Sequence, residues 1–192
     1  MAALILRKLY RITGIIFPIV YYFFTKSLAL ACILIVLALI LIIEYLRLLH
    51  PEFFRKQKIF NFFAVITKEE ERGRLSSAIQ FLISIFLIIL FFRKNVAITS
   101  ILFLIFADAI SALIGMKFGK IRIGKKTFEG SIGFLDACLF IGLLLQFSPL
   151  YLPWHVILIG SVVATLVEAI PVRLDDNFTI GLICAFVMGV IP

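Results

Sequence analysis

Long, continuously apolar segments alternate with short polar segments along almost the whole chain. The hydrophobic residues are not spaced at every second position, which favours helices over half-buried strands. An open sheet edge also cannot satisfy its backbone hydrogen bonds in lipid. The apolar segments lie at about 12 to 25, 27 to 43, 75 to 92, 95 to 116, 131 to 147, 150 to 170 and 178 to 191. We therefore expect an all-α fold, a polytopic transmembrane bundle of about seven spans, with six as the alternative because the first and last segments are short.

The composition supports a membrane location. Of the 192 residues, 63% are hydrophobic and only 16% are charged. A soluble domain of this size would need a largely polar surface, which this composition does not supply. We expect one integral membrane domain over residues 1–192, with the lipid bilayer as a partner and no separate soluble domain.

The positive charges indicate the orientation of the spans. Sixteen of the 19 Lys and Arg residues fall in alternate connections: the N-terminal tail and the connections near 44 to 74, 117 to 130 and 171 to 177. The other connections contain only Lys26, Arg93 and Lys94. Cytoplasmic loops are the ones enriched in Lys and Arg, so the N-terminus is predicted to be cytoplasmic. The net charge of +8 is assigned to this bias and to anionic head groups, and no nucleic-acid partner is expected.

The acidic residues gather on the same side, although they do little to set orientation. Every Asp and Glu lies in or beside a predicted inner connection, except Asp108 and Asp136, which lie within spans. We expect the cytoplasmic end to carry a site equipped for chemistry. Asp108 is the first candidate, because a carboxylate at membrane depth must face the bundle interior and have a partner. The alternative is a protonated acid that makes a helix-packing hydrogen bond.

The connection that follows, GMKFGKIRIGKKTFEGSIG, is rich in glycine and cations. Glycines let backbone N–H groups approach an anion, and cations balance phosphate charge, so this segment is a candidate phosphate cradle. It is not a P-loop, because Lys126 occupies the position that needs Ser or Thr and no buried strand precedes it. The alternative is a basic loop at lipid head groups.

A third polar element, VEAIPVRLDDNFTI, follows the sixth span. Asp175 and Asp176 are adjacent carboxylates beside Asn177 on a short turn, and Mg²⁺ usually takes one or two carboxylates together with phosphate oxygens and water. A solvated turn that caps the last span is the alternative. Its predicted side of the membrane, shared with the glycine-rich connection, favours the metal site.

Taken together, these elements resemble the CTP-dependent polyprenol and lipid kinases, the group that contains dolichol kinase, phytol kinase and the fungal-type diacylglycerol kinase. The matching elements cover almost the whole chain: RKLYRITG, EYLRLLHP with Glu44 and Arg47, the segment from Glu71 to Ser77 with Arg74, FADAISALIGMKFGK with GKKTFEGSIG, and EAIPVRLDDNFTI. Similar proteins often have His at the position of Arg11, so this chain departs from the pattern there.

The resemblance implies transfer of the γ-phosphoryl group of CTP to the hydroxyl of a membrane lipid alcohol at the cytoplasmic face, with Mg²⁺ or another divalent cation. The lipid would be a polyprenol, a phytol-like isoprenoid or a diacylglycerol. The implied catalytic residues are Asp108, Lys126 and Glu129, and the implied metal ligands are Asp108, Asp175 and Asp176. The implied nucleotide-binding residues are Gly115, Gly119, Lys120, Lys125, Lys126, Thr127, Gly130 and Asn177, and the supporting residues are Glu44, Arg47, Arg74 and Glu168. Either Asp108 or Glu129 would accept the hydroxyl proton, and Glu168 would orient Lys126 or Arg47.

Two other functions fit some of these features. The CDP-diacylglycerol synthases have a similar run of Asp, glycines and KTxEG, but they attack the α-phosphorus and release pyrophosphate. A small transporter would use Asp108 and Asp136 as an ion path. The polar residues gather toward one face instead of forming a route across, which favours the enzyme.

Overall fold

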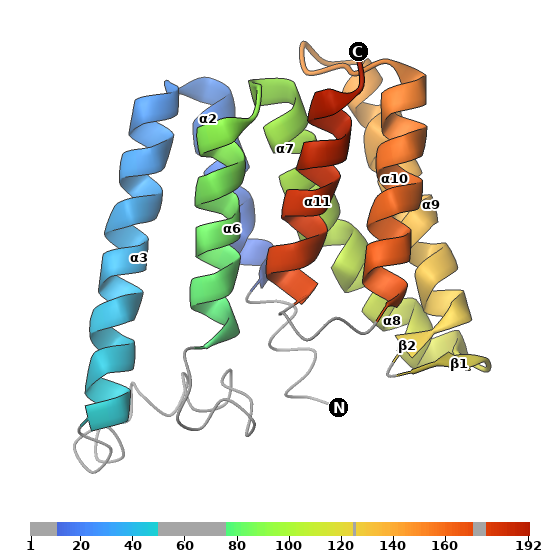
Figure 1. Cartoon of the computed structure of the whole chain (residues 1–192), viewed down its shortest axis with the longest axis horizontal. Coiled ribbons are helices and arrows are strands. Elements are labelled where there is room, and N and C mark those ends of the chain that lie inside the picture. Colours follow the sequence, from blue (N-terminus) through green and yellow to red (C-terminus); the bar gives the residue numbers. More distant parts are fainter. Residues whose placement is uncertain (1–10, 50–75, 125, 171–175) are drawn as a thin grey trace.

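The structure is a computed structural model of the chain, and it describes residues 11–49, 76–124, 126–170 and 176–192, the side chains of 176 and 177 excepted. Helix α2 (Ile16–Phe23) follows a 3-10 turn, η1 (Thr13–Ile15), and precedes α3 (Lys26–Leu49) and α6 (Ser77–Phe91). Helix α7 (Lys94–Leu102) continues through a π-helical turn, η3 (Phe103–Ala107), into α8 (Asp108–Phe118). The remaining elements are β1 (Arg122–Ile123), β2 (Lys126–Thr127), α9 (Phe128–Gln146), α10 (Trp154–Ala169) and α11 (Asp176–Val190) (Figure 1).

The all-α prediction is confirmed, because each predicted apolar segment contains one helical stretch and the described residues add only a small hairpin. Three stretches, Lys26–Leu49, Lys94–Phe118 and Phe128–Gln146, are long and apolar enough to cross a membrane. The other four are apolar but shorter. Three boundaries differ from the prediction by three residues or more. Helix α3 continues past residue 43 to Leu49, α9 begins at Phe128 instead of 131 because Thr127 caps it, and α10 begins at Trp154 instead of 150.

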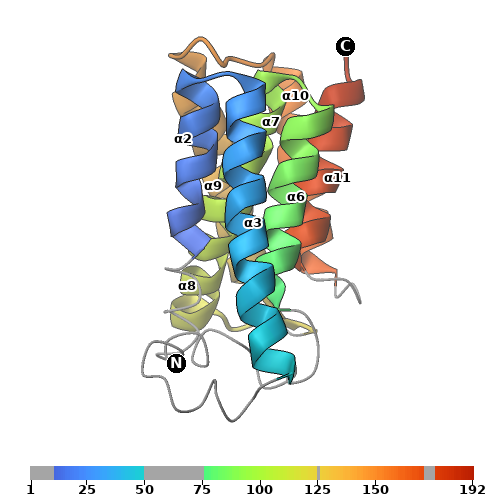
Figure 2. The ribbon, with the colours of Figure 1, turned by 90° about the vertical axis from the view of Figure 1, so that its left-hand side faces the viewer.

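The helices lie side by side, and their connections alternate between the two ends of the bundle (Figures 1 and 2). The stretch Lys94–Phe118 lies at the centre, where α7 packs against α2, α6 and α11 and α8 packs against α9. Helix α3 lies at one edge against α2 and α6. In the most apolar 18 residues of the central stretch, 67% of the window is buried, whereas in those of α3 only 17% is buried. Helix α3 therefore has a largely exposed apolar surface.

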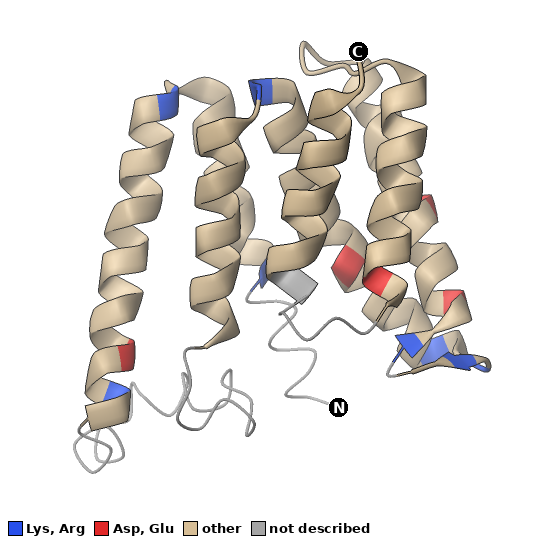
Figure 3. Cartoon of the chain, in the orientation of Figure 1, with Lys and Arg blue, Asp and Glu red and all other residues tan. Residues whose placement is uncertain are grey.

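Charged residues gather at the end of the bundle where the hairpin lies, called here the hairpin end (Figure 3). At the opposite end, Lys26 Nζ donates to the Leu90 carbonyl of α6 at 2.6 Å, and Lys94 Nζ donates to the Tyr22 carbonyl of α2 at 2.8 Å. Carbonyls in the last turn of a helix lack partners and form the negative end of the helix dipole. Both lysines therefore stabilise the end of a neighbouring helix.

Helices α8 and α9 and strand β2 meet at glycines. A Cβ atom at Gly115 would lie 2.7 Å from Thr127 Oγ1, and one at Gly133 would lie 2.3 Å from Ile114 Cδ1. Such distances are shorter than side chains tolerate, so these positions favour glycine for close packing. The single described residue with positive φ is Gly124, at 60°, where the hairpin turns between Ile123 and its partner Lys126.

Replacing Gly119 should destabilise this junction. A Cβ there would lie 2.3 Å from the Gly115 carbonyl oxygen and 2.6 Å from Thr127 Cγ2, and the backbone atom cannot move aside cheaply. Overpacking of this kind costs about 1 to 3 kcal/mol. We expect Gly119→Ala to lower the Tm of the detergent-purified protein. Gly181→Ala is the control, because its nearest neighbours are side-chain ends of Ile88 and Leu104 at 3.0 Å, and it should have a smaller effect.

Candidate functional site

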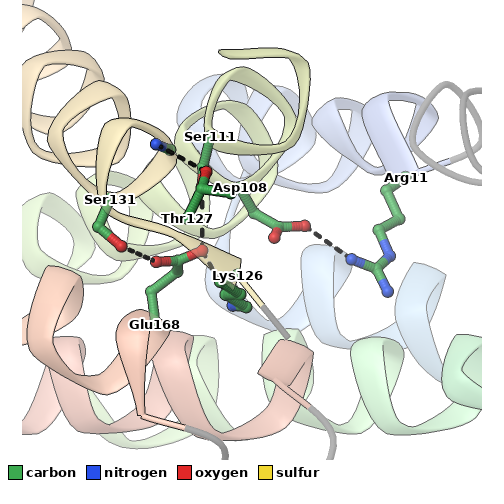
Figure 4. Close-up of polar contacts among 8 residues, drawn as sticks. Arg11, Asp108, Ser111, Lys126, Thr127, Ser131 and Glu168 are labelled. Atoms are coloured by element: carbon green, nitrogen blue, oxygen red, sulfur yellow. Dashed lines mark hydrogen bonds and ion pairs between the residues drawn. The ribbon is translucent and has the colours of Figure 1, made fainter. Parts of the chain in front are cut away.

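A buried carboxylate, that of Glu168, joins three elements at the hairpin end. Glu168 lies in the last turn of α10 and is only 2% exposed. Its Oε1 accepts a hydrogen bond from Ser111 Oγ of α8 at 2.9 Å and lies 2.9 Å from Lys126 Nζ of β2, and its Oε2 accepts from Ser131 Oγ of α9 at 3.1 Å (Figure 4). We call these four residues the Glu168 cluster. Both oxygens have partners, as a buried carboxylate requires.

Local structure places Lys126 at this carboxylate. The side chain of Thr127 caps α9, because its Oγ1 accepts a hydrogen bond from the Gly130 backbone N–H at 3.2 Å. Lys126 comes directly before the cap and pairs with Ile123 in the hairpin. The lysine side chain is 24% exposed, but its ammonium nitrogen is buried beside the Glu168 carboxylate.

A second ion pair lies at the same end. Asp108, the first residue of α8, is 5% exposed, and its Oδ2 accepts from Arg11 Nη1 at 2.7 Å. The expectation that Asp108 faces the interior and has a partner is confirmed, and the partner is a cation. Asp108 and Ser111 are three residues apart on one helix and therefore share a face. Figure 4 shows Asp108 directed at Arg11 and Ser111 at the cluster, so α8 connects the two ion pairs.

The other predicted residues are distributed around this centre. Glu129, in the first turn of α9, accepts from the Ile121 backbone N–H at 3.2 and 3.3 Å and so fastens the hairpin to the helix. Lys120 is exposed. On the edge helix α3, Arg47 Nε donates to Glu44 Oε2 at 2.7 Å. The structure thus places Glu168 beside Lys126, and Arg47 beside Glu44. Gly115, Gly119 and Gly130 all lie against Thr127.

Part of the predicted site lies outside the described residues. This concerns Arg74, Lys125 and Asp175, together with the side chains of Asp176 and Asn177. Asp108 is therefore the only predicted metal ligand whose side chain is described. Among the side chains that the structure describes, no three His, Cys, Asp or Glu residues are grouped as a metal site would require.

Sequence reasoning did not identify Ser111, Ser131 or the role of Arg11 as the partner of Asp108. The serines carried a weak signal, since a hydroxyl within an apolar helix needs an acceptor on its own or a neighbouring helix. Ser111 also lies one turn after Asp108, and Ser131 one turn after Thr127. Arg11 belongs to the RKLYRITG element, but its partner is 97 positions away in sequence.

A separate cavity of about 610 Å³ lies at the opposite end of the bundle. It is lined by Tyr22, Phe23, Lys94, Asn95, Pro149 and Leu150. These residues include no member of the predicted site, and Lys94 is held there by the Tyr22 carbonyl. The cavity is therefore distinct from the Glu168 cluster.

Comparison with known proteins identifies one relationship. The chain is 33% identical over 186 residues to the "Uncharacterized protein RP860" of Rickettsia prowazekii (strain Madrid E), and the match covers 92% of this chain and 88% of that protein. The two proteins belong to one family. No family model matches the chain, and no solved structure does.

Replacing Glu168 should destabilise the fold strongly. Glu168→Ala removes the acceptor of Ser111 and Ser131 and leaves the Lys126 ammonium without its carboxylate. Breaking one side of a buried ion pair costs about 3 to 5 kcal/mol. We expect a loss of this order in the free energy of unfolding, measured by denaturant titration in detergent.

Two further variants show whether the ion pair is responsible. Adding Lys126→Met to Glu168→Ala should recover part of the loss, because the unpaired charge is then gone. Asp136→Asn, which changes an exposed carboxylate of α9, should have little effect. Equal stability of Glu168→Ala and the unmodified protein would contradict the role given to this carboxylate.

Proposed function

We propose that this member of the family is an integral membrane, CTP-dependent lipid kinase, which transfers the γ-phosphoryl group of CTP to the hydroxyl of a lipid alcohol. The observation that supports this best is the grouping of Asp108, Lys126, Thr127 and Glu168 at one end of an apolar helical bundle. These residues come from three sequence elements, and those elements carry the resemblance to the lipid kinases. A site at one end of such a bundle adjoins both an aqueous nucleotide and a lipid in the bilayer.

The proposal includes seven membrane crossings with the hairpin end in the cytoplasm. The apolar helical stretches and the alternation of their connections between two ends support it. The four short stretches, of 10 to 17 residues, would need local thinning of the bilayer or snorkelling of flanking side chains. The opposite end carries only three cations, Lys26, Arg93 and Lys94, whereas most Lys and Arg residues belong to the connections of the hairpin end. This difference fits the positive-inside rule.

Phosphoryl transfer needs positioned reactants and neutralised charge more than covalent help from the protein. Lys126 is suited to the second task, because its ammonium group brings a positive charge to the start of α9, where it lies 2.9 Å from Glu168 Oε1. The start of α9 adds the positive end of a helix dipole. In the reaction, the lipid oxygen would form a bond to the γ-phosphorus, the bond from that phosphorus to CDP would break, and Asp108 or Glu129 would take the hydroxyl proton.

A divalent cation would be held by Asp175 and Asp176, with Asp108 as a third ligand. Such a cation neutralises charge on the transferred phosphoryl group. Among these residues, the structure describes only the Asp108 side chain, and its oxygen lies 2.7 Å from the Arg11 guanidinium. A cation at Asp108 would therefore compete with Arg11 for the same carboxylate. One or two carboxylates are enough for Mg²⁺ when phosphates and water complete its shell, so Asp175 and Asp176 can serve without Asp108.

Separately labelled CTP tests the reaction. Purified protein in mixed micelles is incubated with a panel of lipid alcohols, namely phytol, farnesol, a polyprenol and diacylglycerol, and with CTP labelled at either the α- or the γ-phosphorus. We expect γ-label in one of the lipids and no α-label. Entry of α-label would instead identify a cytidylyltransferase of the CDP-diacylglycerol synthase type. If no lipid acquires label, with CTP or with other triphosphates, the kinase proposal is wrong.

Two substitutions test the assigned residues. Asp108→Asn and Lys126→Ala should each reduce γ-phosphoryl transfer by about 100-fold or more, since one lost electrostatic contact to the transition state has an effect of this size. Asp108→Asn should remain folded, because Arg11 retains an amide partner. Lys126→Ala leaves Glu168 with its two serine partners but without its cation and should lose stability, so turnover is compared per amount of folded protein.

Matched controls change the same residue types elsewhere. Asp136→Asn alters an exposed carboxylate of α9, and Lys26→Ala alters a lysine at the opposite end of the bundle. Both should retain near-normal turnover. Near-normal turnover of Asp108→Asn or of Lys126→Ala would remove that residue from the site.

A further inference from the structure

The segment from Lys117 to Ile123, KFGKIRI, alternates cationic and apolar residues, and the structure exposes both kinds. Lys117, Lys120 and Arg122 are exposed. Phe118 and Ile121 are 57% and 60% exposed, and Ile123 is 39% exposed. Three large apolar side chains this close together on the outside of the molecule, interleaved with cations, are typical of a surface that meets a membrane interface.

The backbone holds these side chains outward. Strand β1 pairs with β2, the Phe128 N–H donates to the Ile121 carbonyl at 2.9 Å, and Glu129 accepts from the Ile121 N–H. Arg122 and Ile123 are successive strand residues, so their side chains point to opposite faces. The hairpin is therefore a fixed, two-sided element and not a loose connection whose apolar side chains could fold back on the bundle.

The cations of this connection divide into two groups by position. Lys126 belongs to the Glu168 cluster and has a side chain that is 24% exposed. Lys117, Lys120 and Arg122 lie on the exposed part of the connection, and Lys117 Nζ lies 5.2 Å from the ring centre of Phe118. Figure 1 shows β1 extending sideways beyond α9 and α10, and Figure 3 shows that its cations lie there. An element in this position reaches beyond the bundle toward the surrounding lipid.

We propose that the segment from Lys117 to Ile123, which comprises the end of α8 and strand β1, is a contact surface for anionic phospholipids. Phe118, Ile121 and Ile123 lie at the boundary of the acyl chains, and Lys117, Lys120 and Arg122 bind the phosphate groups of the lipid heads. The inference rests on the membrane-spanning part of the proposed function and not on the kinase reaction. It assigns this segment a role that is separate from that of Lys126.

A tryptophan reporter tests this surface. The chain has one tryptophan, Trp154, at the start of α10 and the opposite end of the bundle. The full chain with Ile123→Trp and Trp154→Phe is reconstituted into vesicles of phosphatidylcholine and phosphatidylglycerol, with bromine on the acyl chains of one lipid or the other at equal amounts. We expect brominated phosphatidylglycerol to quench the reporter about twofold more than brominated phosphatidylcholine, because cations concentrate anionic lipid locally.

The excess quenching should depend on charge. It should disappear at about 1 M salt, where screening is nearly complete at the distance of a head group, and in the variant that adds Lys117→Gln and Arg122→Gln. Trp154 in the otherwise unmodified chain is the matched control. Adding Lys117→Gln and Arg122→Gln to that chain should not change how strongly either brominated lipid quenches Trp154. Equal quenching by both lipids, no quenching by either, or an excess that survives the substitutions would overturn the proposal.

A nucleotide is the competing occupant of these cations. In vesicles of phosphatidylcholine alone, CTP should leave the emission of the Ile123→Trp reporter unchanged. A shift with CTP that the Lys117→Gln and Arg122→Gln substitutions abolish would assign the cations to the nucleotide and overturn the lipid surface. Because the readout does not use turnover, loss of the preference with phosphoryl transfer intact rejects only this inference. The reverse result rejects only the kinase.

Discussion

The buried carboxylate of Glu168 is the constraint on which the hairpin end of the molecule depends. A carboxylate that is 2% exposed is stable only if hydrogen bonds and a cation compensate for the loss of water. Helices α8 and α9 and strand β2 each supply one such group, so the three elements are fixed relative to α10. Gly115, Gly119 and Gly130 lie against Thr127 with no side chain between them. This close packing brings the partners of Glu168 within hydrogen-bond distance of its carboxylate.

Charge and apolar surface are distributed along the bundle in a consistent way. Lysines at one end neutralise the ends of neighbouring helices, whereas ion pairs between distant segments occupy the other end. The middle consists almost entirely of apolar packing around α7 and η3. Within the described part of the chain, Asp136 is the exception to this distribution, because it is an exposed carboxylate in the middle of α9.

The sequence predicted the helices well because their signal is local. Each apolar run is long and continuous, so a short window of sequence is enough to recognise it. The contacts of the site are not local. Glu168 and Ser111 are 57 positions apart, and Arg11 and Asp108 are 97 apart, so no pattern along the chain could pair them. The sequence grouped the right polar elements at one end, but it could not choose between Lys126 and Arg47 as the partner of Glu168. The hairpin was also missed, because its strands have two residues each and carry no usable periodicity.

The π-helical turn η3 has a consequence for the orientation of the central helix. A π turn closes its hydrogen-bonded ring with one more residue than an α turn, and η3 lies directly before Asp108. Without that additional residue, everything that follows would be rotated by about 100° around the helix axis, which is the angle between successive residues. Asp108 would then turn away from Arg11, and Ser111 away from Glu168. The π turn thus determines the direction in which Asp108 and Ser111, the two buried polar residues of α8, point from the helix.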